Sequence, residues 1–148
     1  MGLDVQYLVD GKYGQNAFFT ATQIEDEQKA VKMIKWLFSK GCKINLSDHL
    51  EQTCLFYVAR DGKLPLVQCL IELGVDINHV DSYGQTALFY ACREGHVDVC
   101  RALAESGAEI DLQDNAHETA LYYAIRYDQC EAAKFLIERG ADVDHSSN

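Results

Sequence analysis

The sequence contains a single proline and a single tryptophan, and its uninterrupted apolar runs are only a few residues long. A membrane-spanning helix needs about 20 consecutive apolar residues, and a secretory signal needs a basic start followed by an apolar run. Neither is present. Apolar residues still make up 48% of the chain and charged residues 24%, a balance typical of folded soluble domains. We therefore expect one domain over residues 1–148, intracellular (cytoplasmic or nuclear), with no membrane partner.

Spacings that carry catalysis or metal binding are also missing. The six cysteines form no Cys-x-x-Cys pair, the histidines stand at no metal-ligand spacing, and there is no glycine-rich phosphate loop. We expect reduced, mostly buried cysteines, with an exposed thiol such as Cys42 as the alternative. The chain is predicted not to be an enzyme and to hold no cofactor or metal. The alternative is a stand-alone enzyme, which activity of the purified chain would support.

Negative charge is concentrated in the later part of the sequence. Residues 1–45 contain six lysines and five acidic residues, whereas residues 46–148 contain seven basic and eighteen acidic residues. Such a surface repels a phosphate backbone, so we expect no nucleic-acid partner. Another protein or a peptide is the expected partner, and a basic one is electrostatically easier to bind.

A short segment recurs with a strict period of 33 residues. Its copies read Thr53-Cys-Leu-Phe-Tyr-Val-Ala, Thr86-Ala-Leu-Phe-Tyr-Ala-Cys and Thr119-Ala-Leu-Tyr-Tyr-Ala-Ile. A second marker follows each threonine by 21 residues: Gly74-Val-Asp-Ile-Asn, Gly107-Ala-Glu-Ile-Asp and Gly140-Ala-Asp-Val-Asp. Two apolar segments at helical spacing lie between the markers, separated by a breaker such as Gly62. Each repeat is therefore predicted to be a helical hairpin.

The repeated residues also indicate where the helices begin and end. The threonine hydroxyl is placed to accept a hydrogen bond from a free backbone N–H at the start of the first helix. The glycine suits the left-handed turn that ends the second helix. Pro65 falls in the first turn of its helix, where its missing N–H costs nothing.

These features resemble the ankyrin repeat family, whose phrase Thr-Pro-Leu-His-x-Ala-Ala, Gly-His and Leu-Leu-x-x-Gly-Ala-Asp-Val-Asn maps onto the chain. The third repeat matches best, at Asp81, Gly84, Thr86, Leu88, Ala91, Gly95, His96, Val99, Leu103, Gly107 and Ala108. The resemblance covers about residues 10–146, in repeats at approximately 11–47, 48–80, 81–113 and 114–146. It implies an all-α solenoid of stacked helix-turn-helix hairpins with finger-like turns.

The sequence departs from the family pattern at several positions. The first repeat has four extra residues around Ile24, expected to lengthen the turn or a helix end. The finger-turn glycine is replaced by Glu51 and His117, which leaves the geometry of those turns open. Aromatic packing is expected to replace polar bridging between repeats, because the family histidine is replaced by Phe19, Phe56, Phe89 and Tyr122.

The resemblance implies binding of another protein by the finger tips and the concave face. The finger residues expected to bind are Tyr13, His49, Leu50, Ser82, Tyr83 and Asn115, and Gln52 and Gln85 are placed at the tips with them. Tyr13, Leu50 and Tyr83 are large groups at positions expected to face solvent, where aromatic anchors often dominate binding. The alternative is that each tyrosine packs on the neighbouring finger.

A row of arginines is expected on the concave side, where the first helices end. It consists of Arg60, Arg93 and Arg126, with Tyr127 beside the last, and such a row suits a carboxylate-bearing peptide. The alternative is a set of weak salt bridges. These would run between repeats, because Asp61 and Glu94 directly follow their arginines and adjacent residues do not face each other on a helix.

Two single residues carry further hypotheses. Asn78 stands in a context that resembles the one in which ankyrin proteins undergo asparaginyl hydroxylation, and a plain turn role is the alternative. Trp36 is a candidate, with Tyr83, for an aromatic cage around a methylated lysine. Its alternative is packing in the core or on the outer face, next to the expected core residue Met33.

The second helix of the fourth repeat keeps apolar residues where a capping repeat is usually polar. We therefore expect the chain to be the ankyrin part of a longer polypeptide. Separately, we expect it to be monomeric. The leading hypothesis is a protein-interaction module that binds a partner or substrate protein. The alternative is the targeting or substrate-recognition segment of a larger enzyme, such as a methyltransferase, acyltransferase or ubiquitin-ligase adaptor, reading a basic or methylated-lysine peptide.

Overall fold

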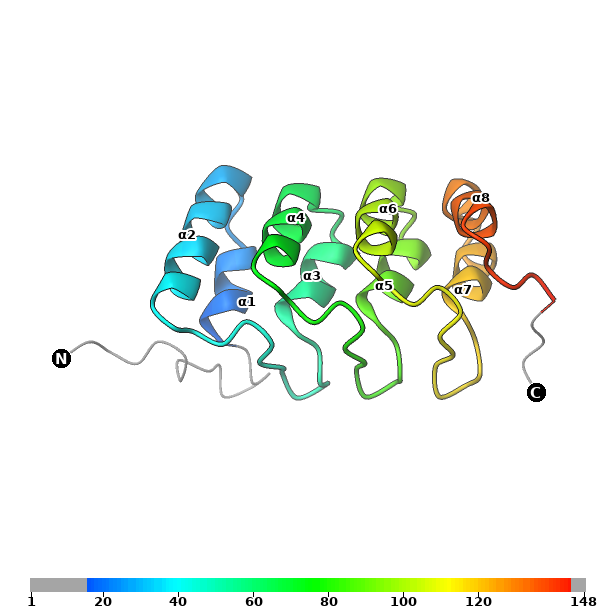
Figure 1. Ribbon diagram of the computed structural model, residues 1–148, viewed down its shortest axis with the longest axis horizontal. Helices are drawn as coiled ribbons and strands as arrows, with labels where there is room; N and C mark the ends of the chain where they lie inside the picture. The colour runs from blue at the N-terminus through cyan, green and yellow to red at the C-terminus, as the bar shows by residue number, and fades with distance from the viewer. Residues whose placement is uncertain (1–15, 145–148) are drawn as a thin grey trace.

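A computed structural model describes residues 16–144, and these fold into eight helices arranged as four hairpins. The first helices of the hairpins are α1 (Ala17–Thr22), α3 (Cys54–Arg60), α5 (Ala87–Arg93) and α7 (Ala120–Arg126). The second helices are α2 (Glu27–Ser39), α4 (Leu64–Glu72), α6 (Val97–Glu105) and α8 (Cys130–Glu138). Figure 1 shows the hairpins side by side in chain order, with the loops that join them projecting from one side. The expected all-α fold is confirmed.

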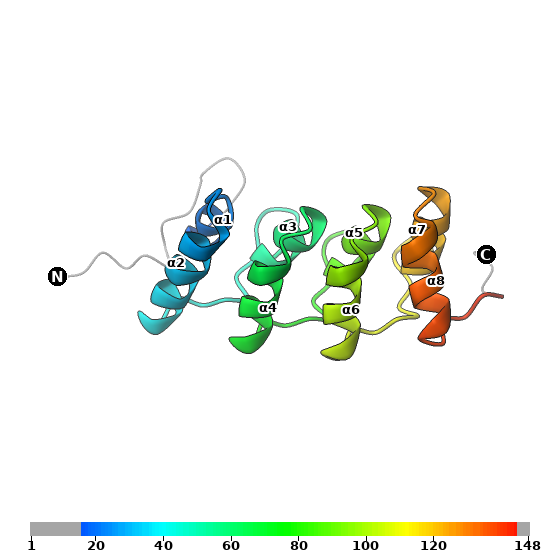
Figure 2. The same ribbon diagram turned by 90° about the horizontal axis from the view of Figure 1, so that it is seen from above.

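The hairpins stack so that each helix contacts its equivalents in the neighbouring repeats. Helix α3 packs on α1 and α5, and α4 packs on α2 and α6. Figure 2 shows two rows of helices, in which the row of second helices bows outward and the row of first helices lies on the inner side of the curve. Within residues 16–144, no helix is long and apolar enough to cross a membrane.

The core follows directly from the repeated apolar residues. Leu70, Leu103 and Leu136 occupy the same place in successive second helices and are fully buried. Leu55 and Leu88 do the same in the first helices. Burying one such side chain contributes about 2 kcal/mol, and no hairpin can bury its apolar faces without a neighbour. The stack therefore forms one continuous core.

The expected helix ends are confirmed, but the expected capping bonds are mostly not. Gly74 ends α4 at a φ of 84°, as the left-handed turn requires. Thr119 accepts a hydrogen bond from the Tyr122 N–H at 3.4 Å, whereas the buried hydroxyls of Thr53 and Thr86 have no partner among the described residues. The N–H that each was expected to cap donates instead to the carbonyl of the same threonine, at 3.1 Å in the case of Phe56.

The four extra residues of the first repeat lengthen its second helix. Helix α2 has 13 residues, while α4, α6 and α8 have nine each. Asp26 caps the lengthened end by accepting hydrogen bonds from the N–H groups of Gln28 and Lys29. Of the two expected outcomes, the structure confirms the longer helix end.

Candidate protein-binding surface

Each finger described by the structure is closed by a buried aspartate. Asp81 Oδ1 accepts hydrogen bonds from the N–H groups of Tyr83 at 2.9 Å and Gln85 at 3.0 Å. Asp48 and Asp114 make the same pair of bonds in their fingers. The tip residues therefore stand on a turn of fixed geometry.

The turn geometry survives the loss of glycine. Gly84 has a φ of 77°, and the residues that replace it, Glu51 and His117, have φ values of 60° and 62°. All three donate their N–H to the carbonyl of the finger aspartate at 2.9–3.0 Å. Residues other than glycine are strained in this left-handed region. Glutamate or histidine in place of glycine therefore lowers stability but leaves the turn geometry unchanged.

The finger tips expose most of the side chains that the sequence places there. Leu50 is 45% exposed and Tyr83 54% exposed, and His49, Ser82 and Asn115 are also exposed. The backbones of neighbouring fingers are joined, because Ser82 N–H donates to the Leu50 carbonyl and Asn115 N–H to the Tyr83 carbonyl, both at 3.0 Å. Tyr13 lies outside the described residues.

Two expected tip residues are buried instead. Gln52 is 7% exposed and Gln85 is 9% exposed, because the side chain of each points toward the following repeat. Gln52 Nε2 donates to Asp81 Oδ2 at 3.0 Å and to the Tyr90 hydroxyl at 2.9 Å. Gln85 Nε2 donates to Asp114 Oδ2 at 2.7 Å. The amide of one finger thus bridges to the aspartate of the next.

The expected replacement of polar bridging by aromatic packing is therefore only half correct. Phe56 packs edge-on against Tyr90 of the next repeat with ring centroids 5.7 Å apart, and Phe89 packs against Tyr123 at 5.9 Å. The hydroxyls of the same tyrosines donate to the finger aspartates. Polar bridging between repeats is therefore kept, but by different residues. In the sequence it is marked by an aspartate, a glutamine four residues later and a tyrosine nine residues later, as in Asp48, Gln52, Tyr57 and in Asp81, Gln85, Tyr90.

Ionisation in this network follows from burial and hydrogen bonding. Burial alone would raise the pKa of Asp114, but hydrogen bonds from Gln85, the Glu118 N–H and Tyr123 outweigh it and lower that pKa. Burial and the bond to Asp114 raise the pKa of Tyr123 to about 12. Burial and the bond to Asp81 raise the pKa of Tyr90 as well. At neutral pH Asp114 is therefore ionised, and Tyr90 and Tyr123 are neutral.

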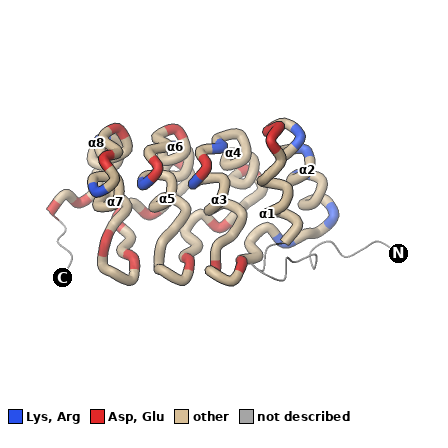
Figure 3. The backbone as a smooth tube through the Cα atoms, turned by 180° about the vertical axis from the view of Figure 1, so that it is seen from behind, with Lys and Arg blue, Asp and Glu red and all other residues tan. Residues whose placement is uncertain are grey.

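The expected row of arginines is present on the first helices. Figure 3 shows basic positions in a row at the C-terminal ends of α3, α5 and α7. Arg60 Nε lies 3.1 Å from Asp61 Oδ1, and Arg93 Nε lies 3.0 Å from Glu94 Oε1. The prediction that such pairs run between repeats is wrong. Each acid occupies the C-cap position just beyond the helix, from which its side chain reaches back to the arginine.

These two arginines also cover tyrosine rings of their own repeat. The guanidinium carbon of Arg60 lies 5.0 Å from the ring centroid of Tyr57, and that of Arg93 lies 4.7 Å from Tyr90. Such cation–π contacts stabilise the arginine in place. Both guanidinium groups are half-buried and already have an acidic partner.

The fourth repeat differs, because Tyr127 stands where the second and third repeats have an acid. Its ring stacks on Tyr123, with centroids 6.5 Å apart and an interplanar angle of 20°. Arg126 turns to Tyr122 and donates from Nη1 to the tyrosine hydroxyl at 3.1 Å. Both Arg126 and Tyr127 are exposed, so this end of the row presents a cation beside an aromatic ring.

Asn78 bonds across the boundary between two repeats. Its Nδ2 donates to the Gly107 carbonyl at 3.0 Å, and its Oδ1 accepts from the Glu109 N–H at 2.9 Å. Asn45 accepts from the Asp76 N–H in the same way at 2.8 Å. This geometry accounts for a turn and bridging role, and hydroxylation of Asn78 stays a prediction.

Trp36 lies on the outer face of α2, and the expectation that Met33 belongs to the core is wrong. Trp36 is 50% exposed and Met33 42% exposed, because the buried face of α2 is formed by Ala30, Ile34 and Leu37. A surface pocket of about 440 Å³ is lined by Lys29, Lys32, Met33 and Trp36. One ring with two ammonium groups is unfavourable for a methylated lysine, which is itself a cation.

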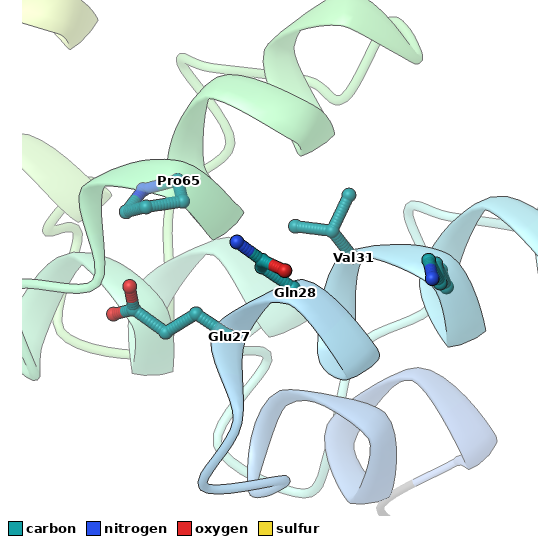
Figure 4. A pocket seen from close by; sticks show the side chains of 5 residues that line it. Glu27, Gln28, Val31 and Pro65 are labelled. Carbon is teal, nitrogen blue, oxygen red and sulfur yellow. The ribbon is translucent and has the colours of Figure 1, made fainter.

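The outer layer has a second depression between α2 and α4. Its volume is about 460 Å³. Figure 4 shows Glu27, Gln28 and Val31 of α2 facing Pro65 of α4 across it. Lys32 also lines this depression, and its lining residues include no serine, cysteine or histidine. Among residues 16–144, no group of three or more His, Cys, Asp or Glu side chains is placed to hold a metal ion.

Five of the six cysteines are buried, and Cys130 is the exposed one. The alternative that named Cys42 as an exposed thiol is wrong, because Cys42 packs into the core with 6% of its surface exposed. Cys130 begins α8 on the outside of the stack. Burial raises the pKa of Cys54 to about 12.

Family models match nearly all of the described residues. A model of ankyrin repeats in three copies matches residues 18–114, and a single ankyrin repeat matches residues 116–145. The chain belongs to the ankyrin repeat family. A search of curated proteins finds no match. Ankyrin repeats are generally protein–protein interaction modules and typically non-catalytic, so this ankyrin repeat protein is a binding module in that general sense.

Proposed function

We propose that this ankyrin repeat protein binds a partner protein across its finger tips and the inner face of its first helices. The supporting observation is the pair Leu50 and Tyr83, two large side chains held outward on neighbouring fingers at 45% and 54% exposure. The Leu50 carbonyl accepts a hydrogen bond from Ser82 in the finger of Tyr83, and the Tyr83 carbonyl accepts one from Asn115 in the following finger. The N–H groups of Leu50 and Tyr83 each donate to the buried aspartate of their own finger. Little conformational freedom remains to be lost on binding, which favours affinity.

The other finger and helix residues have supporting roles in this proposal. His49, Ser82 and Asn115 form a polar rim around the two anchors. On the inner face, Arg126 and Tyr127 contribute to partner binding. Arg60 and Arg93 contribute less binding free energy, because each already forms a salt bridge within its own repeat. A partner with a basic surface fits the formal charge of −10. A monomeric state and an intracellular location stay predictions.

The alternative function uses the same surface. If the repeats target a larger enzyme, the finger anchors hold its substrate in place of a free partner. Reading of a methylated lysine at Trp36 is disfavoured by the two lysines in that pocket, so a basic peptide is the form of this alternative that we keep.

A matched pair of variants tests the proposal. The double variant Leu50→Ala with Tyr83→Ala removes both finger anchors, and Met33→Ala with Trp36→Ala removes a similar exposed apolar area from the outer face of α2. Both are checked for folding by circular dichroism, used for affinity capture, and compared for binding to the purified captured partner by calorimetry. We expect the finger variant to weaken binding at least about tenfold. Loss with the outer-face variant alone would overturn the proposal.

A further inference from the structure

Only one of the three repeat-spaced arginines has no acidic partner within the described residues. Arg60 and Arg93 are each paired with the acid that follows them. Arg126 forms no salt bridge within residues 16–144, because the residue after it is Tyr127. The three arginines look equivalent in the sequence. Within the described residues, however, Arg126 alone among them has no acidic side chain as a salt-bridge partner.

Tyr127 also determines where the Arg126 side chain lies. In the second and third repeats, the arginine covers the tyrosine three residues before it. In the fourth repeat the ring of Tyr127 stacks on Tyr123 instead, and the guanidinium of Arg126 moves over Tyr122, 5.9 Å from the ring centroid. A hydrogen bond from Nη1 to the Tyr122 hydroxyl orients the guanidinium. A guanidinium has five N–H donors, so others are left for a ligand.

Resting on the proposed function, we propose that Arg126 binds a carboxylate side chain of the partner, while a neighbouring apolar partner residue packs on Tyr127. A guanidinium matches a carboxylate with paired, charge-assisted hydrogen bonds. Tyr127 is 50% exposed and its ring also lies 6.0 Å from the guanidinium carbon of Arg93. The ring thus forms an apolar floor between the two arginines of the third and fourth repeats.

The net charge of the chain favours a carboxylate over a phosphate group. The chain carries a formal charge of −10, so each negative charge on a ligand is repelled at long range. A phosphate brings about −2 at neutral pH and a carboxylate only about −1. The carboxylate then sets the register of a partner segment that is otherwise neutral or basic. In any other register, the partner's carboxylate would be repelled by Glu94 or by another acidic side chain of this surface.

The first test uses small probes and needs no partner. N-acetyl-Glu-Phe-amide is titrated into the full chain at millimolar concentration, with N-acetyl-Gln-Phe-amide as the uncharged control and inorganic phosphate as a third probe. Nuclear magnetic resonance follows the arginine Nε–H signals and the Tyr127 ring. We expect the Glu probe to shift Arg126 and Tyr127, with Arg60 and Arg93 little affected. Equal shifts from the Glu and Gln probes, or larger shifts with phosphate, would overturn the inference.

The second test uses Tyr127 variants with the purified partner. Tyr127→Glu gives Arg126 the same intramolecular acid that Arg93 has, so it competes with the partner's carboxylate, while Tyr127→Gln changes the ring without adding charge. We expect Tyr127→Glu and Arg126→Gln to weaken binding about tenfold or more, Tyr127→Gln clearly less than Tyr127→Glu, and Arg60→Gln less than about twofold. Circular dichroism confirms that each variant is folded.

The outcomes separate the two proposals. If Leu50→Ala with Tyr83→Ala abolishes binding while Arg126→Gln binds within about twofold of the wild type, the surface is right and the carboxylate contact is wrong. If neither variant changes binding, the proposed surface itself is wrong. Loss of binding after phosphatase treatment of the partner would identify a phosphate ligand and contradict the choice of a carboxylate.

Discussion

The hydroxyl of Tyr90 in α5 donates at 2.6 Å to Oδ2 of Asp81, which lies nine positions earlier in the finger of the same repeat. The same carboxylate accepts a hydrogen bond from Gln52 of the preceding finger at 3.0 Å and closes its own turn through Oδ1. One buried side chain therefore couples the shape of a finger, the orientation of a helix and the stacking of two repeats.

Replacement of Asp81 is expected to be strongly destabilising. Asp81→Ala leaves the Tyr90 hydroxyl and the Gln85 backbone N–H without their acceptor and removes one of the two acceptors of Gln52 Nε2. We expect this to lower the free energy of unfolding by about 3 kcal/mol. Urea unfolding followed by circular dichroism measures the loss. Ser82→Ala, next to it on the exposed tip, is the control and changes stability by less than about 0.5 kcal/mol. A loss below about 1 kcal/mol for Asp81→Ala would contradict the role assigned to the network.

The strained finger turns predict opposite effects of glycine and alanine. Glu51→Gly and His117→Gly relieve a side chain from the left-handed region and are expected to raise stability by roughly 0.5–1 kcal/mol each. Gly84→Ala introduces the strain, and its Cβ would lie 2.6 Å from Asn115 Oδ1, so it lowers stability by more than about 1 kcal/mol. Melting temperatures of the three variants check the signs. A stabilising Gly84→Ala would show that the turn is more adaptable than its bonds indicate.

The stack is expected to lose stability in alkali through its buried tyrosines. The pKa of Tyr123 is about 12 in the folded chain and about 10 in an unfolded one. Between these values the unfolded state loses its proton first, so the free energy of unfolding falls as the pH rises from about 10 to about 12. Tyr90, whose pKa is also raised, adds to the same fall.

Unfolding midpoints measured across this range test the alkaline effect. Tyr123→Phe lowers stability at neutral pH, because Asp114 loses a donor, but its fall between about pH 10 and pH 12 should be shallower than that of the wild type. Leu50→Ala, which removes no titratable group from an exposed position, is the control and should keep the wild-type slope. Identical slopes in all three proteins would mean that Tyr123 does not titrate with folding.

Thiol reactivity should identify a single accessible cysteine. Cys130 is exposed and the other five cysteines are buried, so a thiol reagent at about pH 8 is expected to label one cysteine rapidly and the rest only as fast as the protein opens. Cys130→Ser removes the fast phase, and Cys42→Ser leaves it unchanged. Mass spectrometry locates the label. Rapid labelling of Cys92 or Cys100, whose sulfur atoms lie 3.1 Å apart inside the third repeat, would show that this repeat opens readily.

The repeat architecture can be inferred from the amino-acid sequence alone. The period of 33 residues and the paired markers at Thr86 and Gly107 specify a hairpin and its ends, because helical periodicity and the left-handed preference of glycine are local properties. The longer α2, the exposure of Leu50 and Tyr83, and the row of arginines follow from the same alignment.

Contacts between repeats determine which polar groups are used within the stack and which remain for a partner. Gln52 and Gln85 are polar residues at sequence positions expected at the finger tips. Their side chains turn inward because a buried carboxylate of the neighbouring repeat accepts their hydrogen bonds. Arg60 and Arg126 occupy equivalent positions in their repeats, but of these two arginines only Arg60 forms a salt bridge with an acid among the described residues. Tyr127 replaces the acid beside Arg126, and its ring stacks on Tyr123. The fold thus follows from local periodicity, which a sequence displays directly. The proposed binding surface depends on contacts between residues about 30 positions apart, which exist only once each repeat has packed on the next.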